Sequence, residues 1–246
     1  MLGDPNSTQP RCCSALGRRQ LLGISTAAVT SALLVPREAL AALTAKQRET
    51  LSPEQILEIM RKGNERFAKG QRKNRDYLRE QRTSASEGQH PAAVLLSCID
   101  SRAPAEVIMD LGLGDVFNAR VAGNVLNDDI AGSIEFATKL AGAKVILVMG
   151  HTACGAIKGA IDGAELGNLT GLLARIRPAV DATTYAGTRS SKDAKFVDAV
   201  ARKNVELTMA RLRETSPVIQ ELLAAKKVVV AGAIYDLATA RMEFFS

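Results

Sequence analysis

The sequence predicts an α/β protein with a central, mostly parallel β-sheet of four strands plus an edge strand, and helices on both faces. Short apolar runs typical of buried strands recur along the chain, and segments with helical periodicity separate them. The chain has 246 residues, of which 46% are hydrophobic and 24% charged, so it can bury one sizeable core. This composition excludes a polytopic membrane protein, and it excludes disorder for the bulk of the chain.

The first 41 residues are predicted to be a cleaved export signal. Arg18 and Arg19 precede an apolar stretch from Leu21 to Val35, and Ala39–Ala41 supplies the small residues that a signal peptidase needs. The paired arginines indicate the twin-arginine route. Cleavage after Ala41 leaves residues 42–246 as a single domain, and an uncleaved N-terminal anchor is the alternative.

A helix is predicted to begin the domain at Ser52. Ser52 can cap it, Pro53 suits the first helical position, and Gln55 completes a capping box. The stretch from Arg61 to Arg82 then has nine basic and three acidic residues. We interpret it as a solvated helix and loop rather than a nucleic-acid or lipid-binding patch, because it has only two aromatic residues for stacking.

The rest of the domain alternates between strands and helices. The predicted strands are Ala92–Ser97, Val116–Val121, Lys144–Met149, Lys227–Ala231 and, at the edge, Arg241–Phe245. The predicted helices are Pro104–Leu111, Asp129–Leu140, a short one near Leu169–Ile176, and Asp193–Arg213.

Three residues with metal-binding side chains follow two of these strands. Cys98 comes directly after the first strand, and His151 and Cys154 follow the third. Functional groups gather at the carboxyl ends of the strands in an open parallel sheet. We therefore expect the two thiols and the imidazole to lie close together.

Two thiolates and an imidazole form a donor set that suits zinc. Three protein ligands leave a fourth position for water or substrate, which is the mark of a catalytic zinc site. Two alternatives remain open: a disulfide between Cys98 and Cys154, which export would permit, or two inert buried thiols.

The same residues carry a resemblance to a known family. Cys98-x-Asp100-x-Arg102 and His151-x-x-Cys154-Gly155 resemble the two signatures of the β-class carbonic anhydrases. Further likeness lies in Gly88-Gln89-x-Pro91, Arg120–Asn124 and Ala231–Asp236, and it extends over about Ser52 to Phe245.

The resemblance implies reversible hydration of carbon dioxide to bicarbonate by attack of zinc-bound hydroxide. It assigns one Zn²⁺ per subunit to Cys98, His151 and Cys154. Asp100 would accept a hydrogen bond from the hydroxide, and Arg102 would hold Asp100 ionised. The alternative for Asp100 and Arg102 is a helix-entry cap and a surface charge.

The resemblance also implies substrate-binding roles for Gln89, Gly123 and Gly155, each of which could instead be a plain turn or packing residue. His90 could shuttle protons, although a loop histidine beside a proline is more often simply exposed. The chain departs from the family pattern at Ile99, Ala103 and Ala240. It also has no tryptophan, so the regulatory anion site of the bicarbonate-inhibited subgroup cannot be completed, which favours a constitutively open form.

A homodimer or dimer of dimers is implied as well, with the N-terminal helix packing on the dimer partner and Gln89 serving the neighbour's zinc cleft. No nucleic-acid partner is expected, and no stable membrane span after signal cleavage. Export places the protein in a periplasm, or in a thylakoid lumen if the source is photosynthetic. The alternative functions are hydrolysis of carbon disulfide or carbonyl sulfide and a catalytically inactive zinc-binding regulator.

Overall fold

The structure is a computed structural model that describes residues 42–246. The predicted export signal lies outside the described residues. Among the described residues, no helix is both long enough and apolar enough to cross a membrane.

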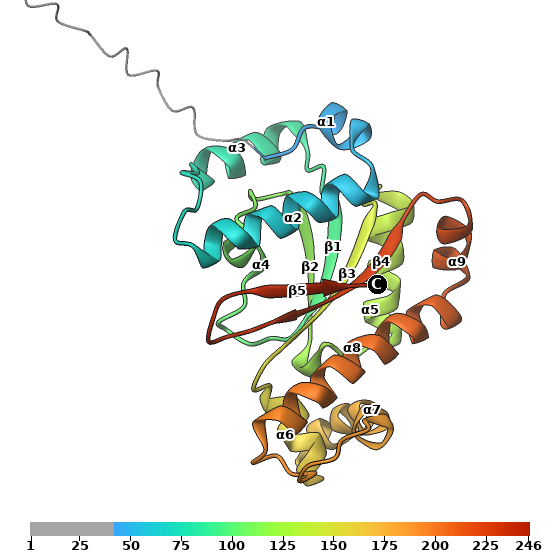
Figure 1. Cartoon of the computed structure of the whole chain (residues 1–246). Helices are drawn as coiled ribbons and strands as arrows, with labels where there is room; N and C mark the ends of the chain where they lie inside the picture. Colours follow the sequence, from blue (N-terminus) through green and yellow to red (C-terminus); the bar gives the residue numbers. More distant parts are fainter. Residues whose placement is uncertain (1–41) are drawn as a thin grey trace, which may run out of the picture. The chain divides into compact units, whose positions relative to one another are not determined.

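A five-stranded sheet forms the centre of the described chain, in the order β2-β1-β3-β4-β5 (Figure 1). The strands are β1 (Ala93–Ser97), β2 (Val116–Arg120), β3 (Val145–His151), β4 (Val229–Tyr235) and β5 (Met242–Phe245). The first four strands are parallel, and β5 pairs antiparallel with β4 at one edge. This arrangement confirms the predicted sheet of four parallel strands and an edge strand.

Helices cover both faces of the sheet. They are α1 (Ala45–Thr50), α2 (Pro53–Ala68), α3 (Tyr77–Glu87), α4 (Ala105–Ile108), α5 (Asp128–Glu135) with a π-helical turn η2 (Phe136–Leu140), α6 (Gly155–Asp162), α7 (Gly167–Ala182), α8 (Ala194–Thr215) and α9 (Pro217–Ala224). A short 3₁₀ turn, η1 (Ala122–Asn124), follows β2.

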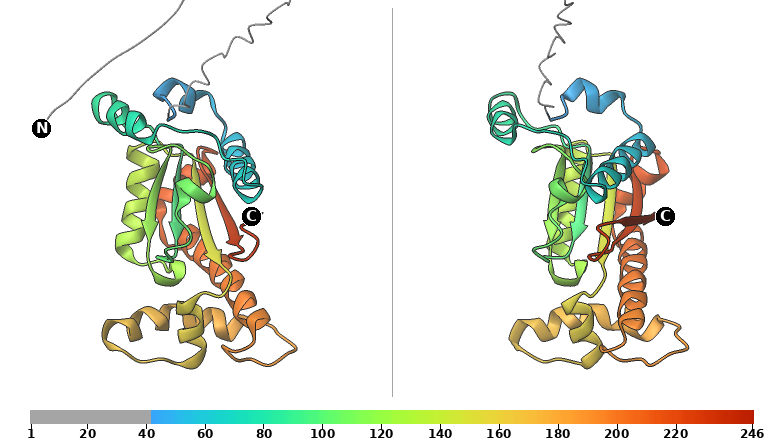
Figure 2. Two further views of the ribbon diagram at one scale, coloured as in Figure 1. Left: turned by 90° about the vertical axis from the view of Figure 1, so that its left-hand side faces the viewer. Right: turned by 60° about the vertical axis from the view of Figure 1, so that its left-hand side comes forward.

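Alternation along each strand divides the core into two layers, because successive side chains of a strand point to opposite faces. On β1, Leu95 belongs to the layer that packs against α2 and α4. Its neighbours Val94 and Leu96 belong to the layer against α5, α8 and α9. The two turned views show these helices on opposite sides of the sheet (Figure 2).

A third apolar cluster lies at the carboxyl ends of the strands. Helices α6 and α7 and the first half of α8 close this end (Figure 1). Ile157, Ile176 and Phe196 form its centre, and Cys98 and Cys154 belong to it. The two thiols are therefore held by the packing of three helices against the sheet.

Helix α2 begins as the sequence predicts. Ser52 accepts from the Gln55 amide, the Gln55 side chain returns a hydrogen bond to Ser52, and Pro53 is the first helical residue. Ile56 and Met60 pack on the sheet of the same chain. A contact of this helix with a partner subunit stays a prediction.

Several elements differ from the sequence prediction. The helix predicted over Pro104–Leu111 is only the single turn α4, because Asp110 adopts a left-handed backbone with φ of 48°. The helix predicted near Leu169–Ile176 is longer and continues through Pro178 to Ala182. Four further helices, α1, α3, α6 and α9, had not been predicted.

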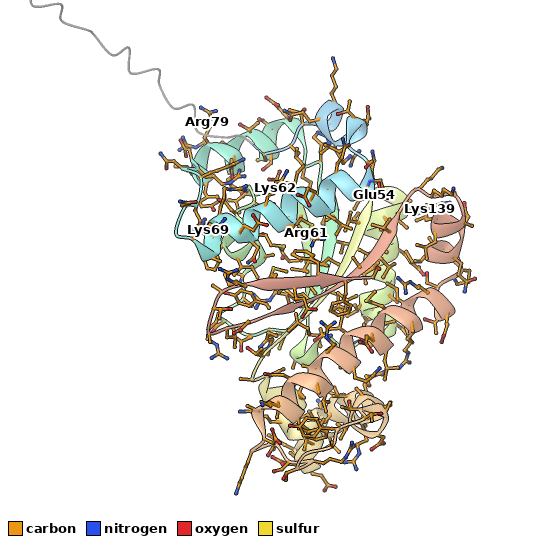
Figure 3. The ribbon with its side chains drawn as sticks, in the orientation of Figure 1. Glu54, Arg61, Lys62, Lys69, Arg79 and Lys139 are labelled. Atoms are coloured by element: carbon orange, nitrogen blue, oxygen red, sulfur yellow. The ribbon has the colours of Figure 1, made fainter. Side chains whose placement is uncertain are left out.

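Salt bridges to carboxylates hold five basic residues of the stretch from Arg61 to Arg82, namely Arg61, Lys62, Arg66, Arg72 and Arg75. Arg66 pairs with the buried Asp110, and Arg75 pairs with the buried Glu80. Figure 3 shows Arg61 and Lys62 along α2, Lys69 just after its end, and Arg79 on α3. Arg61 and Lys62 pair with Glu58. These pairs support the interpretation of a solvated helix and loop.

Candidate metal centre

The two strand ends that carry the predicted ligands lie side by side. Strands β1 and β3 pair in parallel with Ser97 opposite Met149, so Cys98 and His151 emerge at the same edge of the sheet. The chain then turns back through Ala153, which has a positive φ of 55°, and Cys154 becomes the N-cap residue of α6. Parallel pairing and this tight turn bring the three residues together.

The three side chains form a compact, buried group. One ligand atom from each of Cys98, His151 and Cys154 lies within 4.8 Å of the other two. Their residues are 6%, 2% and 2% exposed, respectively. The sulfur atoms are 4.0 Å apart and both cysteines are free, so the structure contains no disulfide between them.

The orientation of His151 leaves one ring nitrogen for a ligand. Its Nδ1 lies 2.9 Å from the carbonyl oxygen of Thr152. A carbonyl only accepts hydrogen bonds, so Nδ1 carries the proton and Nε2 has a free lone pair. Nε2 is buried and has no hydrogen-bond partner. A buried nitrogen without a partner is costly, and a metal ion is one way to satisfy it.

These residues fit a zinc ion. Two zinc–sulfur bonds of about 2.3 Å each can span the observed separation of the sulfur atoms, 4.0 Å, with the metal between them. The free Nε2 completes a set of two thiolates and one imidazole, which zinc accepts. The second ring nitrogen of a metal-ligating histidine usually donates to a carboxylate, a backbone carbonyl or water. Here His151 Nδ1 donates to the Thr152 carbonyl, which fixes the orientation of the ring.

The thiols influence each other's ionisation. The contact between the two sulfur atoms lowers the pKa of Cys98 to about 4, against the opposing effect of burial. The nearby His151 side chain and the Gly123 N–H also lower this pKa. The same contact, together with burial, raises the pKa of Cys154. Burial lowers the pKa of His151, but the nearby Cys98 sulfur and the Thr152 carbonyl outweigh this effect and raise the pKa.

Asp100 lies beside this group and is held by Arg102. Arg102 donates from Nε to Asp100 Oδ1 over 2.9 Å and from Nη2 to Oδ2 over 2.7 Å. Asp100 Oδ2 is 3.8 Å from His151 Nε2. The two hydrogen bonds from Arg102 hold the pKa of Asp100 well below its usual range. The carboxylate is therefore ionised and aimed at the side of the metal group.

Two further residues hold the loops of the site, and sequence reasoning assigned a role to neither. Arg120, at the end of β2, donates to the carbonyl oxygens of Cys98 and Asp100. Asp198, on α8, accepts from the Ala153 amide over 3.0 Å and fixes the turn between His151 and Cys154. Arg120 stands within a stretch that carries the family resemblance, whereas nothing in the sequence pattern marks Asp198.

The residues predicted to bind substrate lie in different places. Gly123 is at the centre, because its N–H donates to Cys98 Sγ over 3.3 Å. Gly155 is exposed at the start of α6, with open space beside its Cα. Gln89 and His90 precede β1 and line a pocket with Glu87 and Gly114 at the other end of the sheet. Within one chain, the structure does not bring Gln89 to the metal group.

The departures from the family pattern have distinct surroundings. Ile99 is 61% exposed, whereas Ala103 is buried in the core beneath α4. Ala240 has a φ of 59°, a backbone conformation that favours glycine. The glycine that the family pattern has at this position therefore has a physical basis, because the turn before β5 is left-handed.

Comparison with known proteins agrees with this geometry. A family described as carbonic anhydrase matches residues 93–242. A carbonic anhydrase of Mycolicibacterium smegmatis is 34% identical over 200 residues, which cover 79% of this chain and 94% of the relative. Carbonic anhydrase 2 of Mycobacterium tuberculosis is 34% identical over 191 residues, covering 76% and 89%.

Solved structures show the same fold. The β-carbonic anhydrase CafA of Aspergillus fumigatus superposes with a TM-score of 0.62 at 29% identity, covering 69% of this chain and 82% of that one. A β-carbonic anhydrase of Sordaria macrospora, described as tetrameric, superposes with a TM-score of 0.59 at 27% identity, covering 68% and 89%.

Proposed function

The chain belongs to the β-class carbonic anhydrases, and from this premise we propose that it hydrates carbon dioxide reversibly to bicarbonate at a zinc ion held by Cys98, His151 and Cys154. One observation carries the proposal. The unpartnered Nε2 of His151 and two buried sulfur atoms converge beside an ionised carboxylate. A zinc-storing protein has no need of that carboxylate.

The residues around the metal group have separate tasks. A zinc ion supplies Lewis acidity, which makes a water molecule a usable nucleophile near neutral pH. Asp100 can accept a hydrogen bond at this position and so orient the donor group. Arg102 binds both carboxylate oxygens from the other side and fixes the direction in which they point. Two thiolates donate more negative charge to a metal than imidazoles do, so hydrogen bonds to sulfur are needed to restore its acidity.

The test is stopped-flow hydration of carbon dioxide by zinc-loaded protein at pH 8.5. We expect activity in the wild type and its loss in Cys98→Ala, His151→Ala and Cys154→Ala. Asp181→Asn is the control, because Asp181 lies in an exposed pair with Arg177 on α7. Zinc occupancy is measured on each sample. A fully zinc-loaded wild type without hydration activity contradicts the proposal.

We also propose that the enzyme assembles as a homodimer or a dimer of dimers. The tetrameric Sordaria relative supports this, as does the position of Gln89, which can reach a metal group only across a subunit interface. Light scattering coupled to gel filtration should give a mass of two or four chains. If the particle is a dimer or tetramer, Gln89→Ala should slow hydration, and a monomer with full activity contradicts the proposed role of Gln89.

Export is a further proposal. It rests on the paired arginines, the apolar stretch after them and the Ala39–Ala41 site, all outside the described residues. Twin-arginine export suits a metalloenzyme because that route moves folded protein. N-terminal sequencing of the protein recovered from a periplasmic fraction should read Ala42-Leu43-Thr44. Recovery of only the full-length chain in the cytoplasm contradicts it.

A further inference from the structure

Helix α8 has a polar residue within its buried stripe, beside the metal group. The stripe includes Val197, Val200, Ala201 and Val205, which face the sheet and the third apolar cluster. Asn204 lies among them and is only 3% exposed. Burying an amide costs free energy unless it is hydrogen-bonded, so this position calls for a partner.

The partner of Asn204 is the turn that contacts Cys98. Asn204 Nδ2 donates to the carbonyl oxygen of Gly123 over 2.8 Å, and the two atoms are buried. The N–H of the same Gly123 donates to Cys98 Sγ over 3.3 Å. One glycine therefore links an α8 side chain to a sulfur atom of the metal group.

The conformation of Gly123 decides where its N–H points. Its φ of 65° and ψ of 21° set the angle between the peptide that donates to sulfur and the peptide whose carbonyl Asn204 binds. Glycine has the widest choice of backbone conformations, so an isolated glycine would not hold this angle. Here Asn204 holds one peptide, and the side chain of Ile176 closes the space where a Cβ would stand, 2.5 Å from its Cδ1.

A hydrogen bond to a thiolate changes the metal that the thiolate binds. The N–H draws negative charge from sulfur, so the sulfur donates less charge to the metal and the metal stays a stronger Lewis acid. A centre with two thiolates depends on this effect more than one with imidazoles alone. The direction in which the Gly123 N–H points therefore matters to the chemistry.

We propose that Asn204 is a positioning residue that tunes the metal centre through the Gly123 peptide and Cys98 Sγ. The inference rests on the proposed function, since it assumes a metal ion at Cys98, His151 and Cys154. Asn204 does not contact the metal group itself. Its effect is carried by two hydrogen bonds with Gly123 between them.

The test uses the full chain loaded with Co²⁺, whose sulfur-to-metal charge-transfer absorption reports how strongly thiolates donate. Asn204→Leu removes the amide donor and keeps the branching at Cγ, with a larger side chain. We expect its charge-transfer band to move to lower energy, because Cys98 Sγ then donates more charge. Its zinc affinity, from competition with a chelator, should fall about tenfold, because the Gly123 N–H no longer stabilises the Cys98 thiolate and holds it in place. Asn204→Asp, which keeps the shape without the amide donor, is measured alongside, so that misfolding of the leucine variant does not remove the test.

The matched control is Thr208→Val, because Thr208 is a buried polar residue one turn further along α8. Thr208→Val should keep the wild-type band and affinity. Wild-type spectra in both Asn204 variants overturn the proposal, even if their stability falls, and so does an equal shift in Thr208→Val. Cys98→Ala gives the background spectrum.

The outcome separates this inference from the proposed function. A wild type that has the thiolate band but no hydration activity contradicts the proposed function and leaves the Asn204 comparison valid. A wild type without a band above the Cys98→Ala background contradicts the metal centre itself, and this inference with it.

Discussion

Arg102 donates hydrogen bonds to both carboxylate oxygens of Asp100, from Nε to Oδ1 over 2.9 Å and from Nη2 to Oδ2 over 2.7 Å. The backbone N–H of Arg102 adds a third hydrogen bond to Oδ1. Asp100 thereby stays 3.8 Å from His151 Nε2 and does not turn inward to take the metal position. The pair keeps the carboxylate ionised and the metal position open.

Asp100→Asn should retain zinc but lose hydration rate. The asparagine keeps the size of the side chain, yet it lacks the negative charge and one of the two accepting oxygens. Proton-handling and orienting groups of this kind contribute at least about 100-fold to a rate, so a loss of about that size is expected. Stopped-flow rates at measured zinc occupancy check it. Asp181→Asn, in the exposed Arg177–Asp181 pair, should leave the rate unchanged.

Arg102→Ala should destabilise the protein in a pH-dependent way. Arg102 lowers the folded-state pKa of Asp100, so the pair stabilises the fold above the ordinary value of 3.8 and loses that effect as the pH falls below it. The free energy of unfolding should therefore drop at pH 7, and the deficit should shrink below pH 4. Urea denaturation of the zinc-free protein measures this. A deficit that grows on acidification contradicts the assignment.

Gly150→Ala should destabilise the fold, whereas Gly155→Ala should not. A Cβ on Gly150 would lie 2.9 Å from Val205 Cγ2 and 3.0 Å from Ile234 Cδ1, in a filled core. Overpacking of this kind costs about 1–3 kcal/mol. Gly155 has open space and begins α6, so its alanine variant is the matched control. Thermal unfolding of both variants measures the difference, and equal melting temperatures contradict it.

Ala240→Gly should stabilise the fold. Ala240 has a φ of 59°, and a left-handed backbone costs a residue with a Cβ about 1–2 kcal/mol. Glycine also gains freedom in the unfolded chain, which offsets part of that, so we expect a net gain of about 0.5–1 kcal/mol. Denaturant titration gives the free energy of unfolding. Lower stability in the glycine variant would show that the turn depends on the alanine side chain.

The sequence predicted the sheet and the metal group because both depend on patterns that recur. Buried parallel strands are short apolar runs, and the groups that follow them must meet at one edge. This rule alone places Cys98, His151 and Cys154 together, without any resemblance to a family. The positions of these residues in the structure follow the same rule.

What the sequence did not predict depends on contacts between distant segments. Helix α3 has few apolar residues and buries only Glu80, so it has no apolar stripe to detect. Helix α9 was missed because it has only eight residues, although Ser216 caps it, Pro217 begins it, and the buried Ile219 and Leu222 lie three positions apart. Asn204 and Asp198 act across 81 and 45 residues of sequence, and such partners become visible only in the folded chain.

Hydration activity measured as a function of zinc occupancy tests the central claim most directly. Metal-free protein is titrated with zinc, and the stopped-flow rate is recorded at each bound ratio. The rate should rise in proportion to bound zinc and level off at one ion per chain. A rate that stays at the buffer value when one zinc ion is bound per chain would contradict the claim that Cys98, His151 and Cys154 form a carbonic anhydrase centre.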